Sequence, residues 1–353
     1  MAFYFANDVK HVHGGSKLNF NNQFKEVQSR RKFFDANERA LAKMSGNAAA
    51  VIPQDVYREF DTVTKRIMRS DEGDTILNDL LPLARSVNIG KIEYKFRRAS
   101  DSGNAKTTIS GQTPVTMDKA KYSYDQTIIP VHQDAFGREW RELEGQRSEG
   151  FDALIDDQEN SVRAARRQMV DWILNGDSSV VFNGNSWTGV KNETTRVARV
   201  DLDADGLNIN FSSAAATAQD MRNGFKSLRD TLRITNKVSG QLTVYVSREI
   251  LSNMERYYSD NEAGYQTILQ AVRSLTGIAD VKETDQLSGN EVIMMALESS
   301  TIMPLVGMGV TTIPVPRATP FDQHNFITWG AMGLMVKTDY DNRTGVLYAA
   351  EFA

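Results

Sequence analysis

The chain has 353 residues, of which 41% are apolar and 24% are charged. This composition is ordinary for a folded protein, and at roughly 100–200 residues per domain the length allows two or three domains. The 41 lysine and arginine residues are balanced by 45 aspartate and glutamate residues, and cysteine is absent. These counts exclude a largely disordered chain, a dedicated duplex-DNA grip, a disulfide scaffold and thiolate chemistry. No secretion signal and no run of ~18 apolar residues is present, so we expect no membrane partner.

Residues 1–88 are expected to form an arm followed by three helices. Residues 1–21 are polar and without period, which favours an extended arm. Helical spacing of apolar residues predicts a helix over 22–46 and a second helix that begins at Pro53. A third, short helix is expected within residues 75–88 and ends near Pro82, because proline cannot continue a helix.

Residues 89–135 have the pattern of a long two-stranded hairpin. Apolar and charged residues alternate over 92–97, and a second strand-like run covers 122–131. The segment between them is rich in Gly, Ser and Thr, which predicts a flexible tip. A lone two-stranded hairpin is only marginally stable in water, so we expect a neighbouring subunit to support it.

The rest of the chain is expected to mix helices and strands. The longest helix is predicted over about 149–175, where apolar residues keep helical spacing and Asn175-Gly176 supplies a stop. Further helices are expected over 217–234, from the cap residue Ser247 through Met254, and over 262–275; strands are expected over 242–247, 292–297, 326–337 and 345–352. Four of the 8 prolines fall within 304–320, which predicts a rigid loop.

The segment DLDADG at residues 201–206 is the sharpest candidate for a metal site. Asp201, Asp203 and Asp205 occupy positions one, three and five of a calcium-binding loop, with Gly206 at position six. Position twelve is Ser212 and not the bidentate glutamate that such a loop needs. A polar turn between strands is the alternative. No other metal and no cofactor is expected.

The sequence contains no convincing catalytic constellation. Patterns such as a P-loop, GxGxxG, HExxH and GxSxG are absent. The four histidines lie apart from any nucleophile pattern: His11, His13, His132 and His324. Arg163, Arg166 and Arg167 flank the longest predicted helix and are candidates for contact with nucleic acid, with a solvated, salt-bridged helix face as the alternative.

The order of these parts resembles that of the major capsid proteins of tailed bacteriophages, which have the Hong Kong 97-type fold shared with encapsulin shells. LLPLARSVNIGKIEYKF is similar to the lead into that family's extended hairpin, the E-loop, and SVRAARRQMVDWILNGDSSVVFNGNSWTGVKN is similar to its spine helix and following turn. AQDMRNGFKSLRDTL with LTVYVSREIL resembles the start of the axial domain, and WGAMGLMVK and LYAAEF resemble strands that return to the sheet. The likeness covers most of residues 75–353 and implies an α+β fold.

The resemblance divides the chain into named parts. They are an arm with helices (1–74), a lead helix (75–88), the E-loop (89–135), a peripheral domain with the spine helix (136–204 and 326–353) and an axial domain (205–325). It implies a structural subunit and not an enzyme. Such a subunit assembles into hexamers and pentamers and encloses double-stranded DNA. Its hairpin and arm lie over neighbouring subunits. The residues expected at contacts between subunits are Arg97, Arg98, Lys106, Arg163, Arg166 and Arg167.

The resemblance also implies partners. Some members join a hairpin lysine covalently to an asparagine of a neighbour; Lys106 has the corresponding place and Asn342 is the candidate partner, although we do not expect the bond here. A separate scaffolding protein without large cleavage of this chain, a portal, a decoration protein and non-specific contact with packaged DNA are implied. Assembly would take place in the cytoplasm of a bacterial host, and the protein would reside in the virion capsid.

Other interpretations of the sequence stay open. The first is an encapsulin compartment, which has the same fold and encloses an enzyme cargo. The second is a calcium-dependent binding protein or a hydrolase built on residues 150–353, and the third is a nucleic-acid-binding module. The absence of a nucleophile, a base and a complete ligand set argues against the second reading, and the net charge of -4 argues against the third.

Overall fold

The fold is that of a computed structural model of the chain. The structure describes residues 25–32, 35–36, 74–103, 105–110, 117–148, 153–203, 207–258 and 266–352. The chain divides into two compact units, Met1–Ile67 and Met68–Ala353. In the first unit, residues 25–32 and 35–36 are helical, within the helix expected over 22–46. The expected arm over 1–21 and the helix beginning at Pro53 lie outside the described residues.

The described helices of the second unit include one long helix, α4, and several short ones. Their bounds are α2 (Asp74–Leu80), α3 (Trp140–Ser148), α4 (Ala153–Leu174), α5 (Ala218–Asp230), α6 (Arg248–Met254) and α7 (Ile268–Arg273), with a 3-10 turn η3 (Leu81–Leu83) and a π turn η4 (Thr231–Thr235). Thr217 and Ser247 cap α5 and α6 through side-chain oxygens that accept from the backbone N–H of the third helical residue. Both caps, and the short lead helix, which ends at Leu80 near Pro82, are as the sequence predicts.

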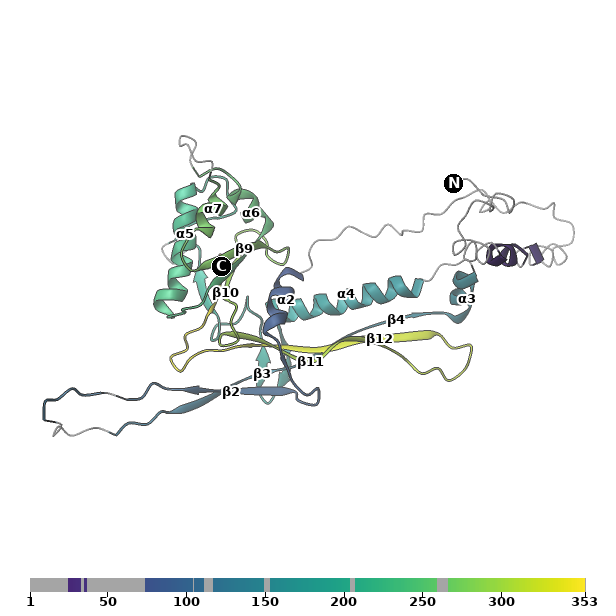
Figure 1. The fold of residues 1–353 in the computed structure, drawn as a ribbon, viewed down its shortest axis with the longest axis horizontal. Helices are drawn as coiled ribbons and strands as arrows, with labels where there is room; N and C mark the ends of the chain where they lie inside the picture. Colours follow the sequence, from purple (N-terminus) through teal and green to yellow (C-terminus); the bar gives the residue numbers. More distant parts are fainter. Residues whose placement is uncertain are drawn as a thin grey trace, which may run out of the picture. The chain divides into compact units, whose positions relative to one another are not determined.

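A four-stranded sheet lies along α4. Its strand order is β1-β11-β12-β4, with bounds β1 (Arg85–Ser86), β11 (Ile302–Pro314), β12 (His324–Val336) and β4 (Val131–Arg138). Figure 1 shows α4 running beside β4, β11 and β12, and contacts join the helix to all three strands. Gly330 allows this approach, since a Cβ there would lie 2.6 Å from Cε of Met169 on α4.

A five-stranded sheet forms a second layer with α5, α6 and α7. Its strand order is β7-β13-β10-β8-β9, with bounds β7 (Ala198–Asp201), β13 (Val346–Ala350), β10 (Val292–Ala296), β8 (Leu242–Val246) and β9 (Ile278–Glu283). All residues of β8, β10 and β13 are buried. Phe225 of α5, Ile250 of α6 and Val272 of α7 are fully buried in the same core. Such continuous apolar strands are typical of a sheet that is covered on both faces.

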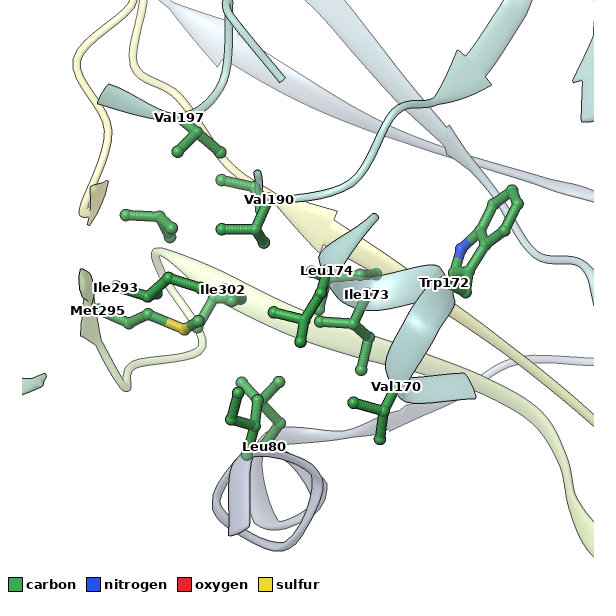
Figure 2. Packing of buried hydrophobic residues seen from close by; sticks show 14 of the residues in the cluster. Leu80, Val170, Trp172, Ile173, Leu174, Val190, Val197, Ile293, Met295 and Ile302 are labelled. Atoms are coloured by element: carbon green, nitrogen blue, oxygen red, sulfur yellow. The ribbon is translucent and has the colours of Figure 1, made fainter. Parts of the chain in front are cut away.

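A second core joins α2, α4 and both sheets (Figure 2). Leu80 of α2 and Ile173 of α4 share it with Ile293 of β10 and Ile302 of β11, and all four have 0% exposure. Burying such side chains contributes roughly 1.5–3 kcal/mol each. This shared core packs α2, α4 and the two sheets together.

Two two-stranded hairpins complete the described fold. One is β2 (Glu93–Ala99) with β3 (Tyr122–Ile128), and the other is β5 (Asp177–Phe182) with β6 (Asn185–Trp187). The β5–β6 turn is Asn183-Gly184, and both residues have positive φ, as a two-residue hairpin turn requires. The sequence predicts only that this region is rich in turns.

The expected rigid loop over 304–320 is wrong, because most of it is strand β11. Val306 O accepts from Val87 N, which points the polar groups of Val306 toward the β1 side. Alternation along the strand puts Pro304 on that same side, one residue before its pairing with β1 begins. Val315 N donates to Asn325 O, so by the same alternation Pro314 also faces away from β12. Proline is tolerated where the missing N–H would face a free edge.

Three elements, β3, α3 and α7, also differ from the sequence-based expectation. The second arm of the predicted 89–135 hairpin stops at Ile128, and after Ile129-Pro130 the chain joins the four-stranded sheet as β4. Helix α3 was not predicted, and α7 is shorter than the expected helix over 262–275. The division at residue 326 separates β11 from β12, which pair with each other, and places β13 apart from its partner β10.

Candidate inter-subunit site

The β2–β3 hairpin has two chemically different faces. Tyr94 and Phe96 of β2 pack against a core cluster that contains Met303 and Leu305 of β11. The opposite face carries Arg97, whose Cα partner across the hairpin is Tyr124. The apolar face is therefore packed against the chain's own sheet, and on the Arg97 face Asn183 Nδ2 of the β5–β6 turn donates to Glu93 Oε2 at 3.3 Å.

Hydrogen bonds from three side chains attach the base of the hairpin to other elements. Thr127 Oγ1 donates to Leu334 O of β12 at 2.7 Å, in a buried position. Arg196 Nη1 donates to Gln126 O at 3.1 Å. Arg98 Nη1 donates to Thr338 Oγ1 and to Asn342 Oδ1, each at 3.0 Å. These bonds set the direction in which the hairpin leaves the sheet.

Glu193 and Trp187 hold Arg196 in place. The guanidinium of Arg196 lies over the Trp187 ring, 5.5 Å from its centroid, and 3.8 Å from Oε2 of Glu193. Burial alone would raise the pKa of the Glu193 carboxyl, but hydrogen bonds from Thr195 and the charge of Arg196 bring the pKa below its ordinary value. Glu193 therefore stays ionised at neutral pH and keeps Arg196 aimed at the hairpin.

The outer face and tip of the hairpin are exposed. The guanidinium of Arg97 lies 5.5 Å from the Tyr122 ring centroid and 5.8 Å from that of Tyr124, within cation–π range. Ile109 and Met117, near the tip, have relative exposures of 109% and 100%. Apolar side chains held this far into water indicate a surface that a partner covers.

The six residues expected at inter-subunit contacts lie in three places. Arg97 and Arg98 are at the hairpin base, and Lys106 is exposed near its tip. Arg163, Arg166 and Arg167 lie on α4, where Arg166 Nη2 donates to Asn78 Oδ1 of α2 at 3.3 Å. The structure brings Arg98 to Asn342, a pairing that the sequence did not predict.

One face of the four-stranded sheet points away from α4 and carries apolar side chains; we call it the α4-free face. Trp172 of α4 lies edge-on to His132 of β4, with ring centroids 6.1 Å apart, so His132 and its β12 partner Gly330 are on the face toward α4. Side chains alternate along a strand, so the residues next to these two point away from α4. On that other face lie Trp329, half-buried, and Ile313, 45% exposed. The buried Nε1 of Trp329 has no hydrogen-bond partner among the described residues.

Arg138 joins the end of β4 to both neighbouring helices. Its guanidinium donates to Asp157 of α4 at 2.6 and 3.0 Å and to Glu142 of α3 at 2.6 Å. These hydrogen bonds raise the pKa of Arg138 above its ordinary value. The acidic residues before and within the start of α4 therefore serve partly as structural ion partners.

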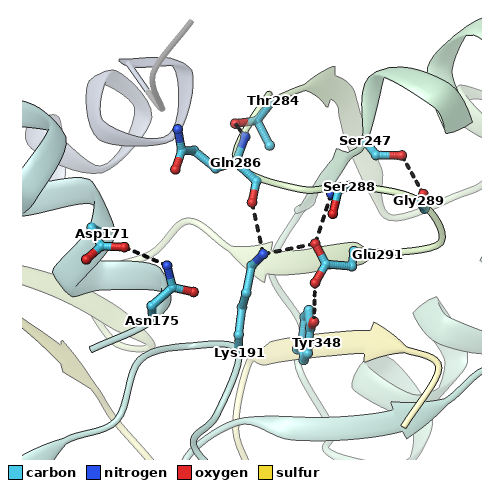
Figure 3. Close-up of polar contacts among 10 residues, drawn as sticks. All are labelled: Asp171, Asn175, Lys191, Ser247, Thr284, Gln286, Ser288, Gly289, Glu291 and Tyr348. Carbon is cyan, nitrogen blue, oxygen red and sulfur yellow. Dashed lines mark hydrogen bonds and ion pairs between the residues drawn. The ribbon is translucent and has the colours of Figure 1, made fainter. Parts of the chain in front are cut away.

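A polar network ties the loop after β6 to the five-stranded sheet (Figure 3). Lys191 Nζ lies 2.9 Å from Glu291 Oε2 and donates to Gln286 O at 2.9 Å. Tyr348 OH donates to Glu291 Oε1 at 2.6 Å. Burial alone would raise the pKa of Glu291, but the bonds from Tyr348 and Lys191 bring it below its ordinary value. No local motif in the sequence signals this network, because its members are far apart along the chain.

The aspartates of the predicted calcium loop are only partly described. Asp201 Oδ1 accepts from Asp203 N at 3.1 Å, as in a polar turn, and from Phe352 N at 3.4 Å. Asp205 lies outside the described residues. Within the described part of the chain, no group of three or more metal-ligating side chains comes together.

The histidines do not form a site with one another in the described structure. His132 is buried in β4, with Nε2 3.2 Å from Met332 O, and burial lowers its pKa. His324 Nε2 lies 2.9 Å from Arg317 Nη1 at the start of β12. His11 and His13 lie outside the described residues. Among the helices that the structure describes, none is long and apolar enough to cross a membrane.

Comparison with known proteins places the chain in a family. A model for a family of unknown function, DUF6260, matches residues 47–349. The chain belongs to this family. No curated protein matches the sequence.

The fold of this DUF6260 member is similar to that of solved capsid proteins. The likeness to the capsid of Myoviridae phage XM1 has a TM-score of 0.63 at 8% identity, over 87% of this chain and 100% of that one. For the capsid of a native GTA particle the TM-score is 0.55 at 13% identity, over 87% and 99% of the two chains. For Microbacterium phage Oxtober96 it is 0.55 at 10% identity, over 88% and 98%. The chain therefore has the α+β Hong Kong 97-type fold, and the expectation from the sequence is confirmed.

Proposed function

We propose that the protein is the structural subunit of an icosahedral bacteriophage capsid. It assembles into hexamers and pentamers and encloses double-stranded DNA. The observation that carries this proposal is the β2–β3 hairpin, which bears fully exposed Ile109 and Met117 on a Hong Kong 97-type fold. In a shell, a neighbouring subunit would cover these side chains and supply the support that a lone hairpin lacks.

The α4-free face of the four-stranded sheet is the surface we assign to the incoming hairpin. Ile313 is exposed on this face, and Trp329 offers an N–H without an acceptor among the described residues. The apolar tip of one copy and the apolar face of the next are complementary in chemistry. A carbonyl of the incoming hairpin would accept from Trp329 and relieve the cost of its unpaired donor.

The proposal also includes the other expectations from the sequence. The parts 1–74, 75–88, 89–135, 136–204 with 326–353, and 205–325 keep their proposed roles, except for the strand assignments corrected above. Partners would be a separate scaffolding protein, a portal and a decoration protein. The protein would act without catalysis in the virion capsid, after assembly in the bacterial cytoplasm.

Electron microscopy and light scattering of the purified protein test the proposal. Closed icosahedral particles or capsomer rings are the expected result, and DNA inside native particles would distinguish a phage capsid from an encapsulin compartment. A monodisperse monomer or dimer that stays unchanged with concentration and with added scaffolding protein would contradict it.

Substitutions of Met117 test whether the hairpin tip takes part in assembly. Met117→Asp is expected to abolish particles and leave the thermal midpoint of the subunit unchanged, because the side chain is fully exposed. Met117→Leu, the matched control, keeps an apolar tip and should assemble normally. Equal assembly of both variants would remove the hairpin tip from the mechanism.

A further inference from the structure

A cavity lies between the hairpin base and the turn that follows β12. It has a volume of about 420 Å³, within the range of small-molecule sites. Its walls come from β2 at Phe96–Ala99, from the loops at 236–239 and 298–301, and from 337–345. These segments are distant in sequence, so the cavity forms only when folding brings them together.

The lining of this cavity carries an excess of positive charge. The cationic residues of the lining are Arg97, Arg98, Lys237, Lys337 and Arg343. The acidic residues are Glu298 and Asp339. Arg343 pairs with Asp339 at 3.7 Å and with Asp341 at 3.2 Å. The other four cations make no ion pair with a carboxylate in the part of the chain that the structure describes.

Two of these cations are half-buried and retain unused hydrogen-bonding capacity. Lys337 Nζ donates to Ser299 O at 2.7 Å, and burial together with the charge of Arg85 lowers its pKa. Arg98 uses Nη1 for two hydrogen bonds, whereas its buried Nε has no partner in the described structure. A partly buried cation without a counter-ion is costly, and an anion beside it offsets that cost.

The unpaired cations also lie at different depths. Lys237 is exposed at the cavity and Arg98 and Lys337 are half-buried, whereas the guanidinium of Arg97 lies over the Tyr122 and Tyr124 rings on the opposite face of the hairpin. Arg98, Lys237 and Lys337 come from three separate wall segments, an arrangement that suits a compact anion better than an extended acidic strand. Arginine forks and lysine ammonium groups are the donors that proteins use for phosphate.

We propose that this cavity binds a compact phosphate anion that carries two or more negative charges. The phosphate groups would come either from free polyphosphate or from the backbone of nucleic acid. The proposal does not depend on the assembly of the protein into shells, because all the lining residues belong to one chain.

Isothermal titration of the full-length chain with sodium tripolyphosphate at low salt tests the proposal. One saturable site is expected, and its affinity should fall as salt is added, because salt screens the charges. Lys337→Gln, and separately Lys237→Gln, should each weaken binding by about tenfold or more, the factor that corresponds to one lost charge-assisted hydrogen bond. Because Lys237 is exposed, the second variant guards against misfolding of the first.

Lys226→Gln is the matched control, because Lys226 is exposed on α5 outside the cavity and loses the same charge. It should bind tripolyphosphate like the unaltered chain. Equal binding by all variants, or no saturable binding at all, would overturn the proposal.

Competition experiments separate the two sources of phosphate. Displacement of tripolyphosphate by a short DNA duplex, lost in Lys337→Gln, would assign the site to nucleic acid. Failure of the duplex to compete would assign it to free polyphosphate. Stronger binding of an oligo-glutamate peptide than of either phosphate probe would overturn the assignment to phosphate.

Discussion

Thr127 gives a direct measure of how firmly the hairpin is attached to the sheet. Its hydroxyl donates to Leu334 O at 2.7 Å, and the two residues have exposures of 3% and 0%. The pairing of β4 with β12 ends at Ala331, so β4 does not reach the carbonyl of Leu334. The threonine hydroxyl takes the place of a strand partner there.

Thr127→Val keeps the shape of the side chain and removes the donor. A buried carbonyl that loses its hydrogen bond costs about 1–3 kcal/mol. At roughly 2–4 °C per kcal/mol for a large domain, the thermal midpoint of the subunit should fall by about 2–12 °C. Amide protons of β3 should also exchange faster, because this bond holds the hairpin base to β12.

Differential scanning calorimetry and hydrogen exchange on unassembled subunits check the prediction. Thr127→Ser is the control: it keeps the donor and loses one buried methyl group, which costs about 0.8 kcal/mol. A free energy of unfolding for Thr127→Val within about 0.5 kcal/mol of the unaltered chain would refute the reasoning. So would faster exchange in β3 for the serine variant than for the valine variant.

Three further predictions concern the two cores. Burial lowers the pKa of His132. Its contribution to stability is therefore fully present above about pH 6.5 and is lost as the pH falls toward the folded pKa. In urea unfolding, the His132→Gln variant should lose less stability at acid pH than the unaltered chain. Asn253→Ala removes the donor to Phe211 O and Ser213 O and should cost about 1–3 kcal/mol by the same assay, with no loss refuting the role. Gly224→Ala would place a Cβ 2.7 Å from the Phe211 ring and should cost about 1–3 kcal/mol through overpacking; an unchanged thermal midpoint would contradict this.

The features that the sequence predicts well are local ones. The apolar stripe of α4 and the caps at Thr217 and Ser247 depend on residues within one or two helical turns, and the structure has them where they are expected. The order of the elements was enough to predict the Hong Kong 97-type fold.

The features that the sequence hides depend on partners far along the chain. Pro304 and Pro314 suggested a loop because a sequence does not show which side of a strand faces a free edge. The bond from Arg196 to Gln126 joins residues 70 positions apart, and no local pattern indicates it. The same limit explains why the cavity beside Arg98 could not be predicted.

The position of β13 has a consequence for the timing of folding. This strand, Val346–Ala350, joins β7 to β10 and is thus an inner strand of the five-stranded sheet, although it is the last described strand of the chain. Leu347 pairs with Ala198, so the sheet closes over a very long stretch of sequence, a contact that forms slowly. A nascent chain that still lacks residue 350 leaves β7 without its partner. The five-stranded sheet would therefore become complete only after β13 has been added to it.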